Sequence, residues 1–254
     1  MTNPFDLTGK VALITGSGRG LGFGMAKGMA EAGATVVLND ISEEQLAVAC
    51  AKLAEDGLKA ETAIFDVTDS AAIAAAVADI EARVGAVDIL VNNAGIQRRY
   101  PLVDFPDEEW QAVMDLNLTA PFKMAKAVAK GMLERQAGKI INICSLNAII
   151  MRPTIPAYTA AKGGLMLLTR AMAVEWAKDN IQTNAIAPGY YDTEMTKPLV
   201  EDPEFDAFVK KRVPASRWGK PEDLAGTAVY LASNASNFVN GQMIVADGGM
   251  SCSM

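Results

Sequence analysis

The best candidates for acid–base chemistry in this 254-residue chain are a tyrosine and a lysine, Tyr158 and Lys162. They lie four positions apart in a stretch with helical periodicity, so both side chains face the same side. An unperturbed phenol has a pKa of about 10. A cation ~4 Å away, at an effective dielectric near ~20, favours the phenolate by up to about 4 kcal/mol, or roughly three pKa units. The pair predicts a phenol that titrates near neutral pH; the alternative is a partly exposed tyrosine beside a solvated lysine.

The chain contains no histidine, which narrows the possible chemistry. Ser-His-Asp triads, His-paired cysteines and nearly all zinc catalysis are excluded. Cys50, Cys144 and Cys252 are scattered without metal-ligand spacing, so we expect no metal site. An acid–base group that works near neutral pH must therefore be a tyrosine, lysine, cysteine or carboxylate with a shifted pKa.

A glycine-rich segment follows the first apolar run. Val11–Ile14 reads as a strand, and the following turn leads into a helix-forming stretch. In an open α/β sheet such a turn receives a pyrophosphate. Gly16 can let the chain leave the strand tightly, Gly20 can let the backbone approach the phosphates, and Gly22 can let the helix pack closely. Helix caps and packing contacts use glycines in the same way, so the segment alone leaves both interpretations open.

Asp40 ends the second apolar run, Val36–Asn39, eighteen residues beyond Gly22. In dinucleotide sites an acidic residue at this place accepts hydrogen bonds from the adenosine ribose. Asp40 could instead cap the next helix, where Ser42–Gln45 forms a capping box. Ser42 suffices for that cap, so we favour the ribose role.

Three other features are weaker signals. Ser145 and the segment Asn92–Gly95 each follow an apolar run, and the carboxyl ends of parallel strands form the edge at which ligands bind. Ser145 could equally be a turn or cap residue. Asn117 interrupts a long helical pattern in which asparagine has poor propensity, and such a misfit hints at function.

Apolar runs and amphipathic stretches alternate along the chain. The expected strands are Val11–Ile14, Thr35–Leu38, Ala60–Phe65, Ile89–Val91, Ile140–Cys144, Gln182–Ile186 and Met243–Val245. The expected helices are Leu21–Glu31, Glu43–Asp56, Ala71–Val84, Glu108–Arg135, Ala157–Lys178 and Pro221–Ala232. This alternation predicts an α/β fold of the Rossmann type, a doubly wound parallel sheet of about seven strands with helices on both faces.

We expect a single domain, 1–254, for dinucleotide binding and catalysis, with a lid-like substrate segment around 188–217. Phe205, Phe208 and Val209 predict a helical insert within that segment. A net charge of −7 argues against nucleic acid and an anionic membrane surface as partners. The absence of a long apolar run or a signal pattern, with an odd number of cysteines, predicts a cytoplasmic protein.

Together these motifs are similar to those of the short-chain dehydrogenase/reductase family, over essentially the whole chain. The matching pieces, in order, are Thr15-Gly16-x3-Gly20-x-Gly22, Asp66-Val67, Asn92-Asn93-Ala94-Gly95, Asn117, Ser145, Tyr158-x3-Lys162, Pro188-Gly189-x3-Thr193 and the ending Val239-Asn-Gly241 to Asp247-Gly-Gly249. No single motif is decisive, but their joint order and spacing are specific.

The resemblance implies a nicotinamide-dependent enzyme with four catalytic residues. Tyr158 would exchange a proton with the substrate, and Lys162 would lower the pKa of the phenol and hold the nicotinamide ribose. Ser145 would hydrogen-bond the substrate oxygen, and Asn117 would hold a water that links Lys162 to bulk solvent. The residues implied to line the cofactor, besides Tyr158 and Lys162, are Gly16, Arg19, Gly20, Leu21, Gly22, Asp40, Asp66, Val67, Asn93, Ala94, Gly95, Pro188, Gly189 and Thr193.

Asp40 also predicts the choice of cofactor. The 2′-phosphate of NADP would bring about two negative charges beside this carboxylate, which favours NAD. Arg19, within the glycine-rich turn, suits NADP-using relatives, so NADP stays possible. The repulsion from Asp40 acts directly on the extra phosphate, and we therefore predict that NAD is preferred.

Within the family, the chain most resembles gluconate 5-dehydrogenases. The shared segments are Asn92–Arg99, Glu134–Ser145, Ala187–Tyr190, Thr193–Lys197, Val200–Asp202 and Ala215–Gly219. This implies a small-molecule sugar acid as substrate, with interconversion of D-gluconate and 5-dehydro-D-gluconate as the first choice. The alternatives are a 2-dehydro-3-deoxy-gluconate dehydrogenase, a general polyol dehydrogenase and a non-catalytic redox sensor. The chain departs from these sugar-acid dehydrogenases in Leu146–Met151, which follows the serine and is expected to line the pocket.

Arginines could bind the substrate carboxylate, because a planar guanidinium pairs with it bidentately. Arg99 is the first candidate and Arg152 the second. Arg98, which also follows the Asn92–Gly95 loop, and Arg217, which closes the lid segment, could point to the same cleft; each arginine could equally be a solvated surface residue. Ser145 and Tyr158 complete the predicted substrate contacts.

The family resemblance further implies a homotetramer. One interface would pair the helices over 108–135 and 157–178, and another would use the last strand and the tail 241–254. An apolar stripe on the second helix suits the first interface, although core packing explains it equally well. The residues of that stripe are Leu165, Leu168, Met172 and Trp176.

Overall fold

The computed structural model describes residues 3–253, built around a parallel sheet of seven strands in the order β3-β2-β1-β4-β5-β6-β7. The strands are β1 (Val11–Ile14), β2 (Thr35–Asp40), β3 (Ala60–Ile64), β4 (Ile89–Asn92), β5 (Gly138–Ile143), β6 (Ile181–Pro188) and β7 (Met243–Ala246). Each predicted run is a strand, with ends displaced by at most two residues. The prediction of a doubly wound, Rossmann-type sheet is confirmed.

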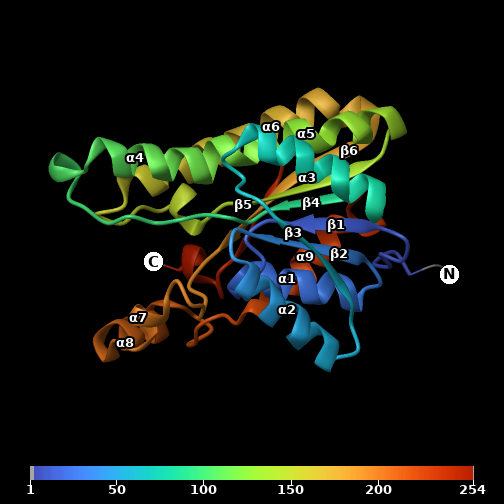
Figure 1. Cartoon of the computed structure of the whole chain (residues 1–254). Coiled ribbons are helices and arrows are strands. Elements are labelled where there is room, and N and C mark those ends of the chain that lie inside the picture. The colour runs from blue at the N-terminus through green and yellow to red at the C-terminus, as the bar shows by residue number, and fades with distance from the viewer. Residues whose placement is uncertain (1–2, 254) are drawn as a thin grey trace.

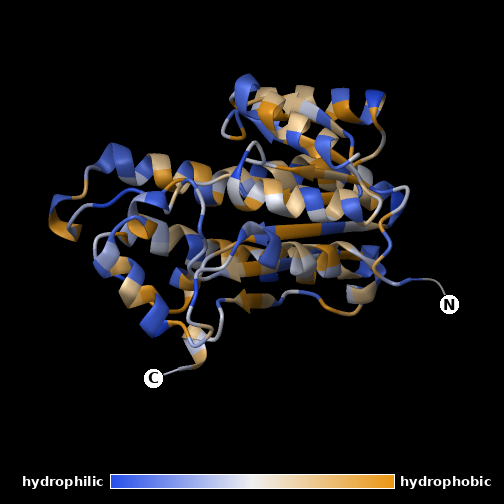
Figure 2. Ribbon diagram, turned by 90° about the horizontal axis from the view of Figure 1, so that it is seen from below, coloured by the Kyte–Doolittle hydropathy of each residue, from blue (hydrophilic) through white to orange (hydrophobic). Residues whose placement is uncertain are grey.

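Helices cover both faces of the sheet (Figure 1). One layer holds α1 (Gly20–Glu31), α2 (Glu43–Glu55) and α9 (Pro221–Ala232), and the other holds α3 (Ser70–Arg83), α5 (Ala120–Arg135) and α6 (Pro156–Trp176). In β1, Ala12 and Ile14 pack into the first layer, and Val11 and Leu13 into the second. Burial on both sides explains why central strands such as β1 and β4 read as nearly continuous apolar runs. Figure 2 shows the same division, with hydrophobic strands inside and hydrophilic helix surfaces outside.

The helix predicted over 108–135 is interrupted, which corrects the sequence-based boundaries. α4 (Asp107–Met114) passes into a π-helical turn at Asp115–Thr119 before α5 begins. Pro121 lacks the N–H that would bond to the Asn117 carbonyl, so a regular α-helix cannot continue through this turn. Within this turn the Asn117 side chain bonds back to the preceding helix, because its Nδ2 donates to the carbonyl oxygen of Val113 at 2.9 Å.

The 188–217 segment folds into two short helices, α7 (Lys197–Val200) and α8 (Pro203–Arg212). They project from the end of the sheet at which α4 also projects, on the opposite side of it (Figure 1). This end holds the carboxyl ends of the strands, where β1 lies between β2 and β4 and the order of the sheet reverses. Ligands of open α/β sheets bind at such a reversal. In the described range 3–253, no helix has both the length and the apolar composition needed to cross a bilayer.

Candidate active site

The glycine-rich turn joins β1 to α1 in a conformation that needs glycine. Gly16 and Gly20 have φ angles of 59° and 60°, in the left-handed region that strains any side chain. A Cβ on Gly22 would lie 2.5 Å from the carbonyl oxygen of Gly16, so only glycine lets α1 start so close to the turn. The N-cap residue Arg19 makes no side-chain cap. The first N–H groups of α1 therefore fit the pyrophosphate of a dinucleotide.

Asn93 fastens the loop after β4 to this turn. Its Nδ2 donates to the carbonyl oxygens of Thr15 and Gly16 at 2.9 and 2.8 Å. The N–H groups of Asn93 and Ala94 both donate to Thr15 Oγ1. A Cβ on Gly16 would lie only 2.9 Å from Ala94 Cα, so the residues predicted to line the cofactor lie directly against the turn.

Asp40 faces the glycine-rich turn from the end of β2. A Cβ on Gly18 would lie 3.0 Å from Asp40 Oδ2. Ser42 Oγ caps α2 by accepting the N–H of Gln45, and Asp40 Oδ1 accepts the N–H of Ser42. The cap belongs to Ser42, as the sequence indicated, and Asp40 Oδ2 remains directed at the turn.

Two residues after β3 border the same region. Val67 is buried and shares a small cavity with Thr15 and Ala94. Asp66 is exposed, and its Oδ1 accepts both the N–H and the hydroxyl of Thr68. Asp66 therefore borders the region at the surface, and Val67 lies beneath it.

The segment after β6 closes the far side of the turn. Pro188 ends β6, and the N–H of Gly189 donates to the carbonyl oxygen of Ala246 in β7. Thr193 packs on the glycine-rich turn, since a Cβ on Gly20 would lie 3.7 Å from Thr193 Cβ. Leu21, in the first turn of α1, is partly buried against the core. The structure thus brings predicted cofactor residues from five separate segments together at the edge of the sheet beside the glycine-rich turn.

Tyr158 and Lys162 lie together on α6, behind the end of β5. Lys162 Nζ is 5.7 Å from the centroid of the Tyr158 ring and donates to the carbonyl oxygen of Ile143 at 2.6 Å. Lys162 and Ser145 are only 4% and 7% exposed. Because each of these groups is held by backbone of β5 or α6, their mutual positions are set by the contact between helix and sheet.

Asn117 reaches the same place from the π-helical turn. Its Nδ2 donates to the carbonyl oxygens of Ile96 and Val113, both at 2.9 Å, and its Oδ1 has no partner within residues 3–253. A Cβ on Gly95 would lie 2.6 Å from Asn117 Oδ1 and 3.7 Å from Lys162 Nζ. The amide oxygen and the ammonium therefore face each other across Gly95, and all four predicted catalytic residues meet.

Burial dominates the protonation of the pair. The pKa of Tyr158 is raised by burial, against a smaller lowering by the Ser145 hydroxyl. The pKa of Lys162 is lowered to about 8, also by burial. The expectation that Lys162 brings the pKa of the phenol to neutral pH is wrong for this arrangement, because burial raises that pKa and the Lys162 ammonium donates to the Ile143 carbonyl oxygen.

Two of the four arginines that are candidates for binding the substrate carboxylate already form ion pairs within the chain. Arg98 Nε bonds to Glu109 of α4 at 2.8 Å. Arg217 is paired with Asp223 of α9, which accepts from both of its terminal nitrogens. These guanidinium groups are occupied by carboxylates of the chain itself.

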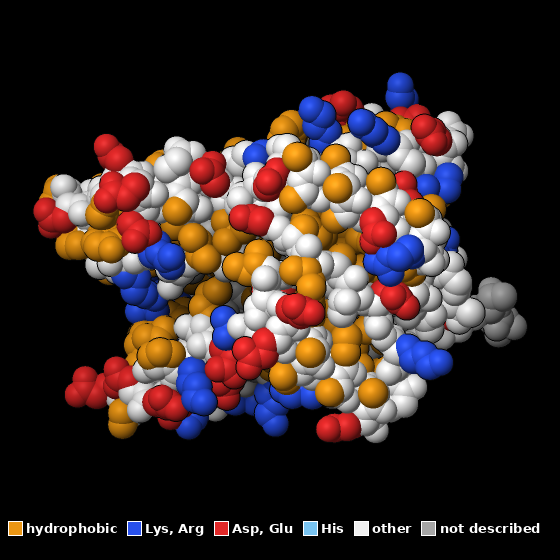
Figure 3. All heavy atoms as spheres, in the orientation of Figure 1, with side chains coloured by type: hydrophobic (Ala, Val, Ile, Leu, Met, Phe, Trp, Pro, Cys, Tyr) orange, Lys and Arg blue, Asp and Glu red, His pale blue; other side chains and the backbone are white. Residues whose placement is uncertain are grey.

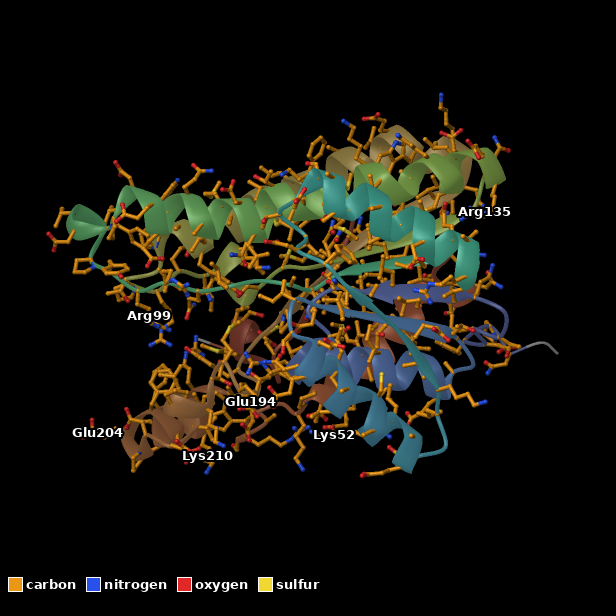
Figure 4. The ribbon with its side chains drawn as sticks, viewed as in Figure 1. Lys52, Arg99, Arg135, Glu194, Glu204 and Lys210 are labelled. Atoms are coloured by element: carbon orange, nitrogen blue, oxygen red, sulfur yellow. The ribbon has the colours of Figure 1, made fainter. Side chains whose placement is uncertain are left out.

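Arg99 and Arg152 are different. Across residues 3–253, neither is within ion-pair distance of a carboxylate. The pKa of Arg99 is lowered by burial and then by the positive charge of Arg152, so the two cations lie near each other. Figure 4 shows Arg99 reaching from the arm that carries α4 into the gap toward α7 and α8. Figure 3 shows basic side chains in the hollow between these two projections, above an apolar floor. Two uncompensated cations in a hollow suit an anion.

Two further features were not predicted as site residues. Asn147 donates to Ser145 Oγ through its backbone N–H at 3.1 Å and its Nδ2 at 3.2 Å. A hydroxyl accepts two such bonds and keeps its own proton free, so Asn147 directs the Ser145 O–H away from itself. An aromatic cluster of Tyr190, Phe205 and Trp218 also lines the hollow beside Arg152. The only sequence signal for Asn147 was that Leu146–Met151 departs from the pattern of the sugar-acid dehydrogenases. The only signal for the aromatic cluster was the helical spacing around Phe205.

No group of three or more Cys, Asp or Glu side chains suited to a metal ion occurs in the described part of the chain. The three cysteines are free: Cys144 is buried, Cys50 is half-buried and Cys252 is exposed.

Comparison with known proteins agrees with the fold. Residues 16–251 match the family model described as Enoyl-(Acyl carrier protein) reductase. The chain is 52% identical over 250 residues to 5-keto-D-gluconate 5-reductase of Escherichia coli K12, covering 98% of each. It is 49% identical over 248 residues to 2-dehydro-3-deoxy-D-gluconate 5-dehydrogenase of Formosa agariphila, covering 97% of this chain and 94% of that one.

A solved relative has the same architecture. It is a gluconate 5-dehydrogenase from Burkholderia cenocepacia J2315 in complex with NADP and tartrate, with a TM-score of 0.94 and 50% identity over 99% of this chain and 98% of that one. The chain belongs to the short-chain dehydrogenase/reductase family. It is an oxidoreductase that uses a nicotinamide cofactor to interconvert a CH–OH group and a ketone.

Proposed function

We propose that the protein interconverts D-gluconate and 5-dehydro-D-gluconate. The observation that carries this proposal is the pair Arg99 and Arg152, two neighbouring guanidinium groups without a carboxylate partner in residues 3–253, of which Arg99 points into the gap toward α7 and α8. A carboxylate on the substrate would be attracted by both, neutralise one of the two positive charges and accept bidentate hydrogen bonds. The names of the E. coli and B. cenocepacia relatives support a gluconate skeleton, and the tartrate beside the latter supports a hydroxy acid.

In this proposal the four clustered residues move one proton. The Ser145 hydroxyl, directed by Asn147, donates to the substrate oxygen and polarises it. Tyr158 gives a proton to the ketone oxygen in reduction and takes it back in oxidation. Lys162 supplies a positive charge beside the phenol. Asn117 Oδ1 accepts a hydrogen bond from a water that returns protons from solvent to Lys162. When bound, the nicotinamide supplies or accepts the hydride.

The raised pKa of Tyr158 suits the reductive direction near neutral pH, because the phenol is then protonated and ready to donate. Oxidation needs the phenolate, so the oxidative rate rises with pH. The two directions of the reaction thus start from opposite protonation states of the Tyr158 phenol.

We propose that the crevice binds the dinucleotide across the glycine-rich turn, with Asp40 at the adenosine ribose. Asp40 supports NAD as the preferred form, since it would repel a 2′-phosphate. Arg19 is exposed and unpaired among the described residues, and it offers a partner for that phosphate. The NADP held by the B. cenocepacia relative supports its acceptance here. We therefore propose that both dinucleotides bind and that NAD is preferred.

A substrate panel tests the function. D-gluconate should give much the highest kcat/KM, with 2-deoxy sugar acids lower and the neutral polyol sorbitol lowest, when nicotinamide absorbance is followed with both cofactors. The F. agariphila relative makes a 2-dehydro-3-deoxy acid the second candidate, and its kcat/KM exceeding that of gluconate would replace the first. If sorbitol reacts as well as gluconate, the carboxylate clamp is wrong and a general polyol dehydrogenase is the better description.

We further propose a homotetramer in the cytoplasm, with 188–217 as the lid of the single domain. Leu165 and Met172 of the predicted stripe are buried in the core, so they are not interface residues. Leu167 and Val174 on α6 are instead 58% and 82% exposed, and Phe122 on α5 is 47% exposed, which supports pairing of these helices. Light scattering that reports a monomer at micromolar concentration would contradict the tetramer.

A further inference from the structure

Arg152 lies in a loop without regular structure, yet its guanidinium is held on two sides. Its Cζ is 4.8 Å from the centroid of the Phe205 ring and 5.8 Å from that of Tyr190. One terminal nitrogen also donates to the Tyr190 hydroxyl. The two rings come from different places: Phe205 from α8, and Tyr190 from the residues just after β6.

The rings themselves are fixed by further contacts. The Tyr190 ring meets those of Phe205 and Trp218 edge to face, with centroids 5.7 and 5.6 Å apart. Trp218 Nε1 donates to Asp206 Oδ1 at 2.9 Å, which ties the cluster back to α8. The position of Arg152 thus depends on the seating of α8.

This support leaves the charge of Arg152 uncompensated. Aromatic faces attract a cation through their quadrupole but carry no net charge. A carboxylate partner, such as the one that Arg98 has in Glu109, would instead cancel the charge and occupy the donors. The two rings supply no counter-charge, and Arg99 adds a second positive charge nearby. The arrangement holds a cation in place while keeping it free for an external anion.

We infer that Phe205 and Tyr190 are positioning residues that hold Arg152 for the carboxylate of the substrate. The carboxylate then binds well only when α8 is packed in its observed position. Selection for acids over neutral polyols therefore depends on residues that do not touch the carboxylate. This inference rests on the proposed sugar-acid function and deepens it.

The test compares an anionic and a neutral substrate in matched variants. Phe205→Leu keeps an apolar side chain but removes the ring face, and Phe205→Trp keeps a ring. Phe208→Leu is the control, because Phe208 neighbours Phe205 on α8 at 5.5 Å between centroids but is 45% exposed. KM and kcat are measured with D-gluconate and sorbitol, and inhibition by tartrate gives the anion's affinity without turnover.

We expect Phe205→Leu to raise KM for gluconate and the inhibition constant of tartrate about tenfold, the effect of losing a desolvated cation–π contact. Its kcat for gluconate and its KM for sorbitol stay within about twofold, because proton transfer and neutral contacts are untouched. Phe205→Trp and Phe208→Leu resemble the wild type. Tyr190→Phe, which loses only the hydroxyl acceptor, raises KM for gluconate about threefold.

Two outcomes separate the inference from the function. Wild-type protein that does not discriminate gluconate from sorbitol would refute the proposed function. Wild-type protein that prefers gluconate, with unchanged gluconate KM and tartrate inhibition in both Phe205→Leu and Tyr190→Phe, would refute the inference alone. Equal losses on gluconate and sorbitol would also refute it, since they show a general structural role. Unchanged affinity for the reduced cofactor in each variant verifies that the crevice is intact.

Discussion

Replacing Gly95 with alanine tests the geometry that joins Asn117 to Lys162. The new Cβ would lie 2.6 Å from Asn117 Oδ1 and 3.7 Å from Lys162 Nζ. Contacts under 3.0 Å are essentially never found at real Cβ atoms, so something must move. Asn117 cannot swing aside without loss, because it is fully buried and its Nδ2 holds two carbonyl oxygens at 2.9 Å.

The expected displacement is about half an ångström, shared between Asn117 and the backbone of the 93–96 loop. A misplacement of ~1 Å at a catalytic site can cost about a hundredfold in rate. We therefore expect kcat of Gly95→Ala to fall about tenfold or more, in both directions of the reaction. The fall arises from a disturbed proton path rather than from lost substrate binding.

The assay measures kcat, KM for gluconate and the dissociation constant of the reduced cofactor. Gly163→Ala is the matched control: the site follows Lys162 on α6, and a Cβ there has nothing within 4 Å. It should keep kcat within about twofold and stabilise the helix by up to ~1 kcal/mol. If Gly95→Ala also keeps kcat within about twofold while binding cofactor normally, Asn117 and Lys162 do not need their observed positions, and the reasoning is wrong.

Further predictions concern protonation, cofactor and stability. Tyr158→Phe should abolish turnover and leave cofactor affinity within a few-fold; retention of more than about a tenth of the rate would exclude Tyr158 as the proton carrier. The kcat/KM for gluconate oxidation should rise with pH in the wild type, because the pKa of Tyr158 is raised; a flat profile from pH ~6 to ~9 would contradict this. NAD should give a higher kcat/KM than NADP, and Asp40→Asn should shift the ratio toward NADP; a wild-type preference for NADP would show that Arg19 outweighs Asp40. Burial lowers the pKa of Lys139 from 10.5 to about 8, so the unfolded chain binds more protons between these values and the free energy of unfolding rises with pH there. Urea unfolding should show that rise, about 3 kcal/mol in size, reduced in Lys139→Met; equal slopes in the two proteins would count against it.

The sequence by itself determined the sheet and most of its helices. Strands buried on both faces must be nearly continuous apolar runs, and helices that cover them must be amphipathic, so both leave local periodic signals. The glycine-rich turn could also be predicted from the sequence, because φ angles near 60° at Gly16 and Gly20 require glycine at those positions. The candidate catalytic residues followed from motif order, because each lies at a fixed place relative to a strand end or a helix turn.

Only the tertiary structure decided which of these groups are free to act. Arg98 and Arg99 are neighbours in the sequence, yet Glu109 neutralises only the first. Arg152 packs on the ring of Phe205, which a helix about fifty residues further along the chain supplies. The pKa of Tyr158 moves upward because burial outweighs its neighbours, and burial cannot be read from spacing. Pairing and desolvation act through space over a few ångströms, so they are set by packing of distant segments and leave no local pattern in the sequence.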